Sequence, residues 1–142
     1  MSYAGDISCK DCWEMLESNP DAHLIDVRTT AEWSFVGIPV LEKLGKSPIL
    51  LEWQQYPSML VNPEFVTAAA TMLEAAGAKK NSRVFTLCRS GMRSIAAAES
   101  LTSAGFENAY NILDGFEGNP DEAGHRATLG GWKFEGLPWM QK

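Results

Sequence analysis

Short apolar runs alternate with helical stretches along this chain, and this alternation restricts the fold more than any other feature. Strand-like runs span His23–Val27, Ile49–Leu51, Arg83–Leu87 and about Ala109–Leu113. Capped or amphipathic helical segments separate them, which is the order expected of parallel strands joined by crossover helices. The sequence therefore predicts an α/β fold, a parallel sheet covered by helices.

Three segments carry signals for the start of a helix. Ser8 is an N-cap candidate for a helix reaching about Ser18, and Thr29 repeats the pattern before a brief helical turn. Asn62–Pro63 is a cap followed by the first helical position. Behind it, one helical face is formed by Phe65, Ala69, Met72, Leu73 and Ala76.

The length and the absence of linkers predict one domain over residues 1–142. Its core covers about 6–118, since the chain beyond Gly118 becomes Gly-rich and irregular. We expect this extension, about 119–142, to pack back on the core, with Trp132 and Trp139 as its anchors.

Charge and cysteine content narrow the function classes. With 12 basic and 18 acidic residues the formal net charge is −6, which argues against a nucleic-acid partner. The amino terminus shows no secretory signal, and no run approaches the ~20 apolar residues that span a bilayer, so no membrane partner is expected. The 3 cysteines form no disulfide framework. We therefore expect a reduced, cytoplasmic setting.

Cys88 is the strongest candidate for chemistry, because it follows a buried strand directly and a helix opens at Gly91 or Met92. Backbone N–H groups in such a loop, together with the start of the helix, favour an anion such as the thiolate of this cysteine. Arg89 and Arg93 could each offer a fork of donors to an oxyanion. Gly91 permits a tight cradle, and the hydroxyl group of Ser90 can donate a hydrogen bond.

Other residues have a plainer interpretation beside the functional one. Asp26, Arg28 and Trp53 are candidates for lining a pocket. The first two are more simply explained as a structural ion pair, or as hydrogen-bonding groups that tie the strand end to neighbouring loops, whereas packing explains Trp53 as well as a place in the pocket wall does. Cys9 and Cys12 form a Cys-x-x-Cys without a second pair, and their spacing places both thiols on one helix face. We interpret that pair as packing.

Several motifs in the same order resemble the rhodanese-like domain family. They are Leu24-Ile25-Asp26-Val27-Arg28 with Glu32-Trp33, the strand Val84–Leu87, the loop Cys88-Arg89-Ser90-Gly91-Met92-Arg93-Ser94, and Asn111-Ile112-Leu113-Asp114-Gly115-Phe116. The resemblance implies a rhodanese-like α/β fold, a five-stranded parallel sheet with helices on both faces. It also implies that Cys88 is the catalytic residue that becomes a persulfide.

The resemblance further implies a sulfurtransferase that moves a sulfane sulfur from a small sulfur-containing anion such as thiosulfate. The acceptor would be a thiophile such as cyanide, a thiol or a protein sulfur acceptor. Substrate-binding positions would be Arg89, Ser90, Gly91, Met92 and Arg93, and neither a cofactor nor a metal is implied. Val36–Val40 departs from the family's usual Gly-His-Ile-Pro-Gly-Ala segment, which leaves the donor and the acceptor open.

Two other functions fit the same resemblance. The loop from Cys88 through Arg93 has the six-residue length that is typical of persulfide carriers in the family, whereas related phosphatases use a longer loop. A phosphatase or arsenate-handling enzyme is therefore disfavoured. A non-catalytic protein-binding module is also disfavoured, since such modules usually lose the cysteine that is retained here.

Overall fold

A central parallel sheet organises the chain in the computed structural model, which describes residues 2–141. The strand order is β1-β8-β7-β2-β4 and every pairing in this sheet is parallel. The strands are β1 (Gly5–Ile7), β2 (Ala22–Asp26), β4 (Ile49–Leu50), β7 (Arg83–Leu87) and β8 (Asn108–Ile112). This is the five-stranded α/β sheet expected from the sequence.

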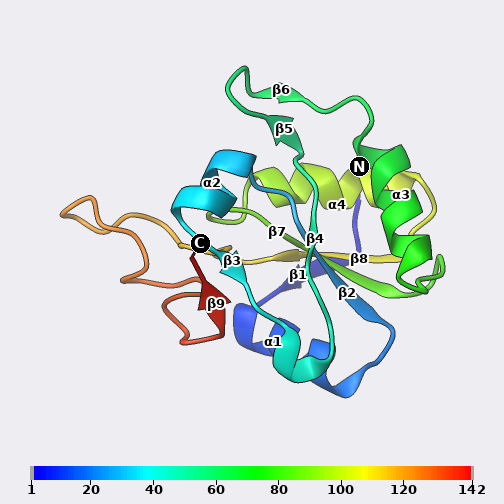
Figure 1. The fold of residues 1–142 in the computed structure, drawn as a ribbon, viewed down its shortest axis with the longest axis horizontal. Coiled ribbons are helices and arrows are strands. Elements are labelled where there is room, and N and C mark those ends of the chain that lie inside the picture. Colours follow the sequence, from blue (N-terminus) through cyan, green and yellow to red (C-terminus); the bar gives the residue numbers. More distant parts are fainter. Residues whose placement is uncertain (1, 142) are drawn as a thin grey trace.

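Helices cover both faces of the sheet, as Figure 1 shows, with α3 and α4 on one side and α1 on the other. The helices are α1 (Cys9–Ser18), α2 (Thr30–Phe35), α3 (Phe65–Ala75) and α4 (Arg93–Ser103), with a short 3-10 turn η1 (Glu42–Leu44). Alternate side chains of β7 divide between the faces: Val84 packs with α3 and α4, and Phe85 packs with α1. The central strand is therefore buried on both sides, which explains its continuous apolar run.

Local cap signals placed two helices correctly. Ser8 accepts a hydrogen bond from the backbone N–H of Asp11 and caps α1. Thr29 and Glu32 form a reciprocal capping box at α2. The third helix begins later than its cap signal indicated, at Phe65. The Asn62 side chain accepts from the backbone N–H of Glu64 and forms a turn before the helix rather than its cap.

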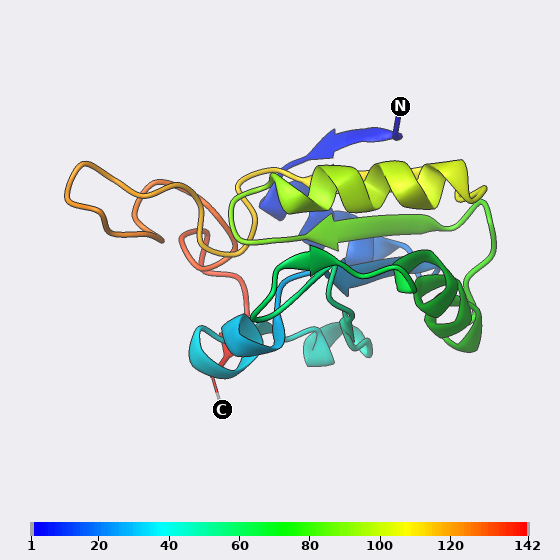
Figure 2. The same cartoon turned by 90° about the horizontal axis from the view of Figure 1, so that it is seen from above.

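Short strands outside the main sheet hold the remaining chain. β3 (Ile38–Pro39) pairs antiparallel with β9 (Trp139–Met140), and β5 (Gln54–Gln55) pairs with β6 (Leu60–Val61). The segment after Gly118 extends beyond the carboxyl ends of the sheet strands in both views (Figures 1 and 2). Within residues 2–141, no helix combines the length and apolar character needed to cross a membrane.

Trp132 attaches the C-terminal segment to the rest of the protein. It is fully buried, meets Trp13 edge to face at 6.0 Å between ring centroids, and donates its indole N–H to the carbonyl of Pro138 at 2.7 Å. Trp139 remains 40% exposed, although its strand pairs with β3 and its ring contacts Phe116. The main attachment is therefore Trp132, and the backbone pairing supplies the second.

Candidate active site

The segment from β7 to α4 carries Cys88 at the carboxyl edge of the sheet. The strand ends at Leu87 and the helix begins at Arg93, so the loop between them is short and must turn sharply. Gly91 makes the turn with a φ of +99°, and a Cβ there would lie 3.2 Å from the backbone nitrogen of Asp114. Glycine is thus required at this position both for its backbone angle and for the close approach of the neighbouring loop.

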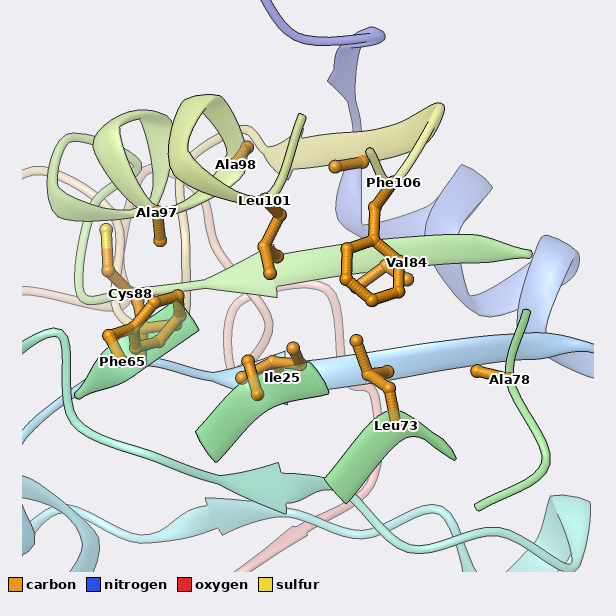
Figure 3. Packing of buried hydrophobic residues seen from close by; sticks show 13 residues of the cluster. Ile25, Phe65, Leu73, Ala78, Val84, Cys88, Ala97, Ala98, Leu101 and Phe106 are labelled. Carbon is orange, nitrogen blue, oxygen red and sulfur yellow. The ribbon is translucent and has the colours of Figure 1, made fainter. Parts of the chain in front are cut away.

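The Cys88 sulfur points towards the start of α4, and the ring of Phe65 lies beside the cysteine (Figure 3). The residue is 1% exposed. Its Sγ accepts the backbone N–H of Gly91 at 3.1 Å and lies 3.1 Å from the Ser94 hydroxyl oxygen. A backbone donor and the first turn of a helix therefore converge on the sulfur, an arrangement that suits a negatively charged atom.

A cavity of about 360 Å³ lies over this sulfur. Side chains from four parts of the chain line it: Glu32, Gln54, Met59, Cys88, Arg89, Ser90, Met92 and Arg93. Of the six loop residues singled out in the sequence, five line the cavity and Gly91 contributes its N–H to the sulfur. The loop thus surrounds a space that ends at the cysteine.

Arg93 does not present a free fork to this space, because its guanidinium group is bound by Glu32. The two N–H···O hydrogen bonds are 2.8 and 2.9 Å long. Burial raises the pKa of Glu32, but the hydrogen bonds and charge of Arg93 outweigh it, so this pKa is lowered. Burial lowers the pKa of Arg93, while the same partner raises it above its ordinary value. The pair holds the guanidinium in place beside the cavity.

Arg89, by contrast, has an exposed side chain. Its guanidinium forms no hydrogen bond or ion pair with any of residues 2–141, although it lines the cavity. The two arginines therefore differ in what they can do: Arg93 supplies a fixed charge, whereas Arg89 is free to close on an anion.

The other pocket candidates lie outside the cavity. Asp26 and Arg28 are fully buried and form a bidentate pair, with Nη2 to Oδ2 at 2.6 Å and Nε to Oδ1 at 2.9 Å. The Arg28 guanidinium also lies 4.1 Å from the centroid of the Phe116 ring. Trp53 packs edge to face on Phe65, with ring centroids 5.1 Å apart. The structural interpretation of Asp26 and Arg28 agrees with this geometry, and Trp53 lines a different surface hollow.

The loop after β8 supports the loop that carries Cys88. The backbone N–H of Phe116 donates to the Cys88 carbonyl at 2.8 Å, and that of Glu117 donates to the Arg89 carbonyl at 2.9 Å. Gly115 lies so close that a Cβ there would be 2.3 Å from the Cys88 carbonyl oxygen. These contacts from the loop after β8 hold the backbone of Cys88 in place. In the sequence, Asp114-Gly115 was noted as part of a family motif, and this supporting role was not predicted.

Glu32 is the main site residue that sequence reasoning missed. Its capping role was visible, because Thr29 precedes it at capping-box spacing. Its pairing with Arg93 was not, since the two residues are 61 positions apart and only the fold brings α2 to the loop.

The Cys9 and Cys12 thiols are buried and unpaired in α1. Burial raises the pKa of Cys9 to about 12, and it raises the pKa of Cys12 well above its ordinary value. Burial thus disfavours the thiolate at both positions, and both side chains pack in the buried cluster that contains Leu16. No group of three or more His, Cys, Asp or Glu side chains within residues 2–141 is placed to hold a metal ion.

The chain is similar in sequence to a described protein family and to several known proteins. The family model described as the STR4 middle domain matches residues 4–142. The uncharacterized protein RC0915 of Rickettsia conorii is 42% identical over 128 residues, which cover 90% of each chain. The Arabidopsis thaliana rhodanese-like domain-containing protein 4, chloroplastic, is 27% identical over 134 residues, covering 94% of this chain and 25% of that protein.

A solved structure is also similar over its whole length. The crystal structure of Rv0390 from M. tuberculosis superposes with a TM-score of 0.86 at 48% sequence identity, covering 99% of this chain and 100% of that one. The arrangement of sheet, helices and C-terminal segment is therefore shared with a protein of matching length.

Proposed function

The chain belongs to the rhodanese-like domain family, and on that premise we propose that it is a sulfurtransferase that carries a sulfane sulfur on Cys88. The observation that carries the proposal is the position of the Cys88 sulfur at the base of the cavity, where it accepts the Gly91 N–H at 3.1 Å. A persulfide formed there would extend from a buried sulfur into a space lined by two arginines.

The donor we propose is thiosulfate or a similar small sulfur-containing anion. The Cys88 thiolate would attack its outer sulfur, the sulfur–sulfur bond of the donor would break, and sulfite would leave with the electron pair. The exposed guanidinium of Arg89 suits the incoming oxyanion, because its N–H donors are not bound by any of residues 2–141. Arg93, held by Glu32, would contribute a fixed positive charge beside the reacting sulfur.

A second nucleophile would then complete the cycle. Cyanide in an assay, or a thiol of a small molecule or protein in the cell, would attack the outer sulfur of the persulfide. The bond between the two sulfurs would break and return its electron pair to Cys88. No general base is needed if the thiol is already ionised, and the sequence of steps needs no external oxidant.

Intact mass spectrometry after incubation with thiosulfate tests the proposal. We expect a gain of one sulfur atom that is lost on adding cyanide and that is absent in Cys88→Ser. Cys9 and Cys12 remain in that variant, so they act as internal controls for non-specific sulfur uptake. No gain in mass for the wild type would reject thiosulfate as the donor. Hydrolysis of p-nitrophenyl phosphate without sulfur transfer would favour a phosphatase instead.

A further inference from the structure

A row of side-chain hydrogen bonds runs from the Cys88 sulfur to the edge of the sheet. Ser94 Oγ lies 3.1 Å from Cys88 Sγ and 2.5 Å from Asn111 Oδ1. Asn111 Nδ2 donates to Asp6 Oδ1 at 3.0 Å, and the hydroxyl group of Tyr3 donates to the same carboxylate oxygen at 2.8 Å. The buried sulfur is thereby connected to a side chain at the surface.

The sheet register creates this row. Asp6 on β1 is the direct partner of Asn111 on β8, which is in turn the partner of Thr86 on β7. Thr86 Oγ1 donates to the backbone carbonyl of Ser94 at 2.9 Å and so seats the first turn of α4 on the sheet. Ser94 and Asn111 are 0% and 1% exposed, whereas Asp6 is exposed. Only the outer end of the row meets solvent.

The chemistry of these groups sets the direction of each hydrogen bond. A carboxylate only accepts, so Asp6 requires the NH₂ group of the Asn111 amide to face it. The amide oxygen of Asn111 then faces Ser94 and takes the single hydroxyl proton of that serine. Ser94 is left with a lone pair towards Cys88, so the Gly91 N–H donates to the sulfur while the Ser94 hydroxyl does not. If the Ser94 hydroxyl turned to donate to the sulfur as well, the buried Asn111 oxygen would lose this donor.

We propose that Asp6 and Asn111 are positioning residues that hold the Ser94 proton away from Cys88 until the sulfur becomes negatively charged. The role of this arrangement in turnover rests on the proposed sulfurtransferase function. When an acceptor thiolate attacks the outer sulfur of the persulfide, the bond between the two sulfurs breaks and its electron pair returns to Cys88 Sγ. The Ser94 hydroxyl then turns from Asn111 to the sulfur that receives the charge.

Other charged groups also face this sulfur. Arg93, paired with Glu32, interacts electrostatically with Cys88 and with Asp26, and Arg89 lines the same cavity. The test therefore uses variants that leave all of these groups in place.

Asp6→Asn is the principal variant, because an amide at position 6 can donate as well as accept. Asn111 can then turn its NH₂ group towards Ser94, which frees the serine proton for the sulfur. We expect iodoacetamide to alkylate Cys88 about three- to tenfold faster at fixed neutral pH, the effect of one hydrogen bond. The ultraviolet absorbance of the thiolate should rise in step. Asn111→Leu removes the competing acceptor and should act in the same direction.

Two controls separate this effect from a change in charge. Asp11→Asn removes the same charge from an exposed position on α1 and should leave alkylation unchanged. In a Ser94→Ala background, the effect of Asp6→Asn should disappear, because the double-mutant cycle isolates what passes through the serine. An Asp6→Asn effect that persists without Ser94 would overturn the proposal. Unchanged alkylation in both Asp6→Asn and Asn111→Leu would do the same.

These alkylation measurements need no sulfur donor, so their outcome does not depend on whether the proposed function is correct. Thiosulfate loading of the wild type, followed by mass spectrometry, tests the function itself. If the variants alkylate faster but thiosulfate adds no sulfur to Cys88, the positioning role of Asp6 and Asn111 stands and sulfur transfer from thiosulfate is rejected. If thiosulfate adds sulfur to Cys88 but the variants alkylate at the wild-type rate, sulfur transfer stands and Asp6 and Asn111 have no role in it.

Discussion

Gly115 offers the sharpest test of how the backbone around Cys88 is held in place. Its φ is +59°, and a Cβ there would lie 2.3 Å from the Cys88 carbonyl oxygen and 2.6 Å from the Arg89 carbonyl carbon. The neighbouring residue, Phe116, donates its backbone N–H to the same Cys88 oxygen at 2.8 Å. Gly115→Ala therefore places a methyl group against backbone atoms that cannot rotate aside.

The cost of this substitution has two parts. An L-residue in the left-handed region costs about 1–2 kcal/mol. Overpacking against backbone adds about 1–3 kcal/mol more, so we expect a total loss of about 2–5 kcal/mol in the free energy of unfolding. Ordinary Cβ contacts begin at 3.4 Å, so Cys88 and Arg89 must move away from Gly115. A displacement of about 1 Å at a reacting group costs about 100-fold in rate.

Gly45→Ala is the matched control, because Gly45 has a φ of +70° and a Cβ there would meet nothing within 4 Å. It carries the same backbone strain without the collision. Urea unfolding and the initial rate of sulfur transfer from thiosulfate to cyanide should be measured for both variants. We expect Gly45→Ala to lose about 1–2 kcal/mol and keep the wild-type rate. Equal stability and equal rates for the two variants would refute the claim that Gly115 positions the loop.

Three further predictions concern charge and anchoring. Because the folded-state pKa of Glu32 is lowered, its contribution to stability is present above the unfolded value of about 4.3 and is lost as pH falls through the folded pKa. Urea titrations across that range should show a smaller acid loss for Glu32→Gln than for wild type. Arg89→Ala should raise the KM for thiosulfate about tenfold, with an unchanged melting temperature since the side chain is exposed. Trp132→Ala should cost about 3–5 kcal/mol in urea unfolding. Phe134→Ala, at a side chain 49% exposed, should cost far less.

Features that depend on neighbouring residues could be predicted from the sequence. The caps at Ser8 and Thr29 are local hydrogen bonds, so their helices begin where the pattern indicated. The buried run Arg83–Leu87 forms the central strand, and the Cys88 loop follows it. The last helix begins at Arg93, slightly later than the Gly91 or Met92 expected, and the start expected at Asn62–Pro63 is misplaced for a physical reason. An Asn side chain can close a turn as readily as it can cap a helix, and the sequence does not distinguish the two.

Features that depend on the tertiary fold could not be predicted from the sequence. The β5–β6 hairpin joins two strands of only two residues each, which is too short for alternation to be visible. The Asp6–Asn111 contact follows from the register of two parallel strands 105 positions apart. Such pairings are set by the sheet as a whole, because a register shift of one residue would place the two side chains on opposite faces of the sheet.

The three arginines near the carboxyl edge of the sheet show why residue type alone could not define the site. Arg28 is fully buried with Asp26, and Arg93 is bound by Glu32, so a carboxylate already holds each guanidinium group in place. Each pair forms because β2, or the helix after it, brings an acidic side chain to the same edge. Arg89 has no such partner among residues 2–141, since it projects outward from the loop. The cation that can respond to an incoming anion is therefore the one that the fold leaves unpaired.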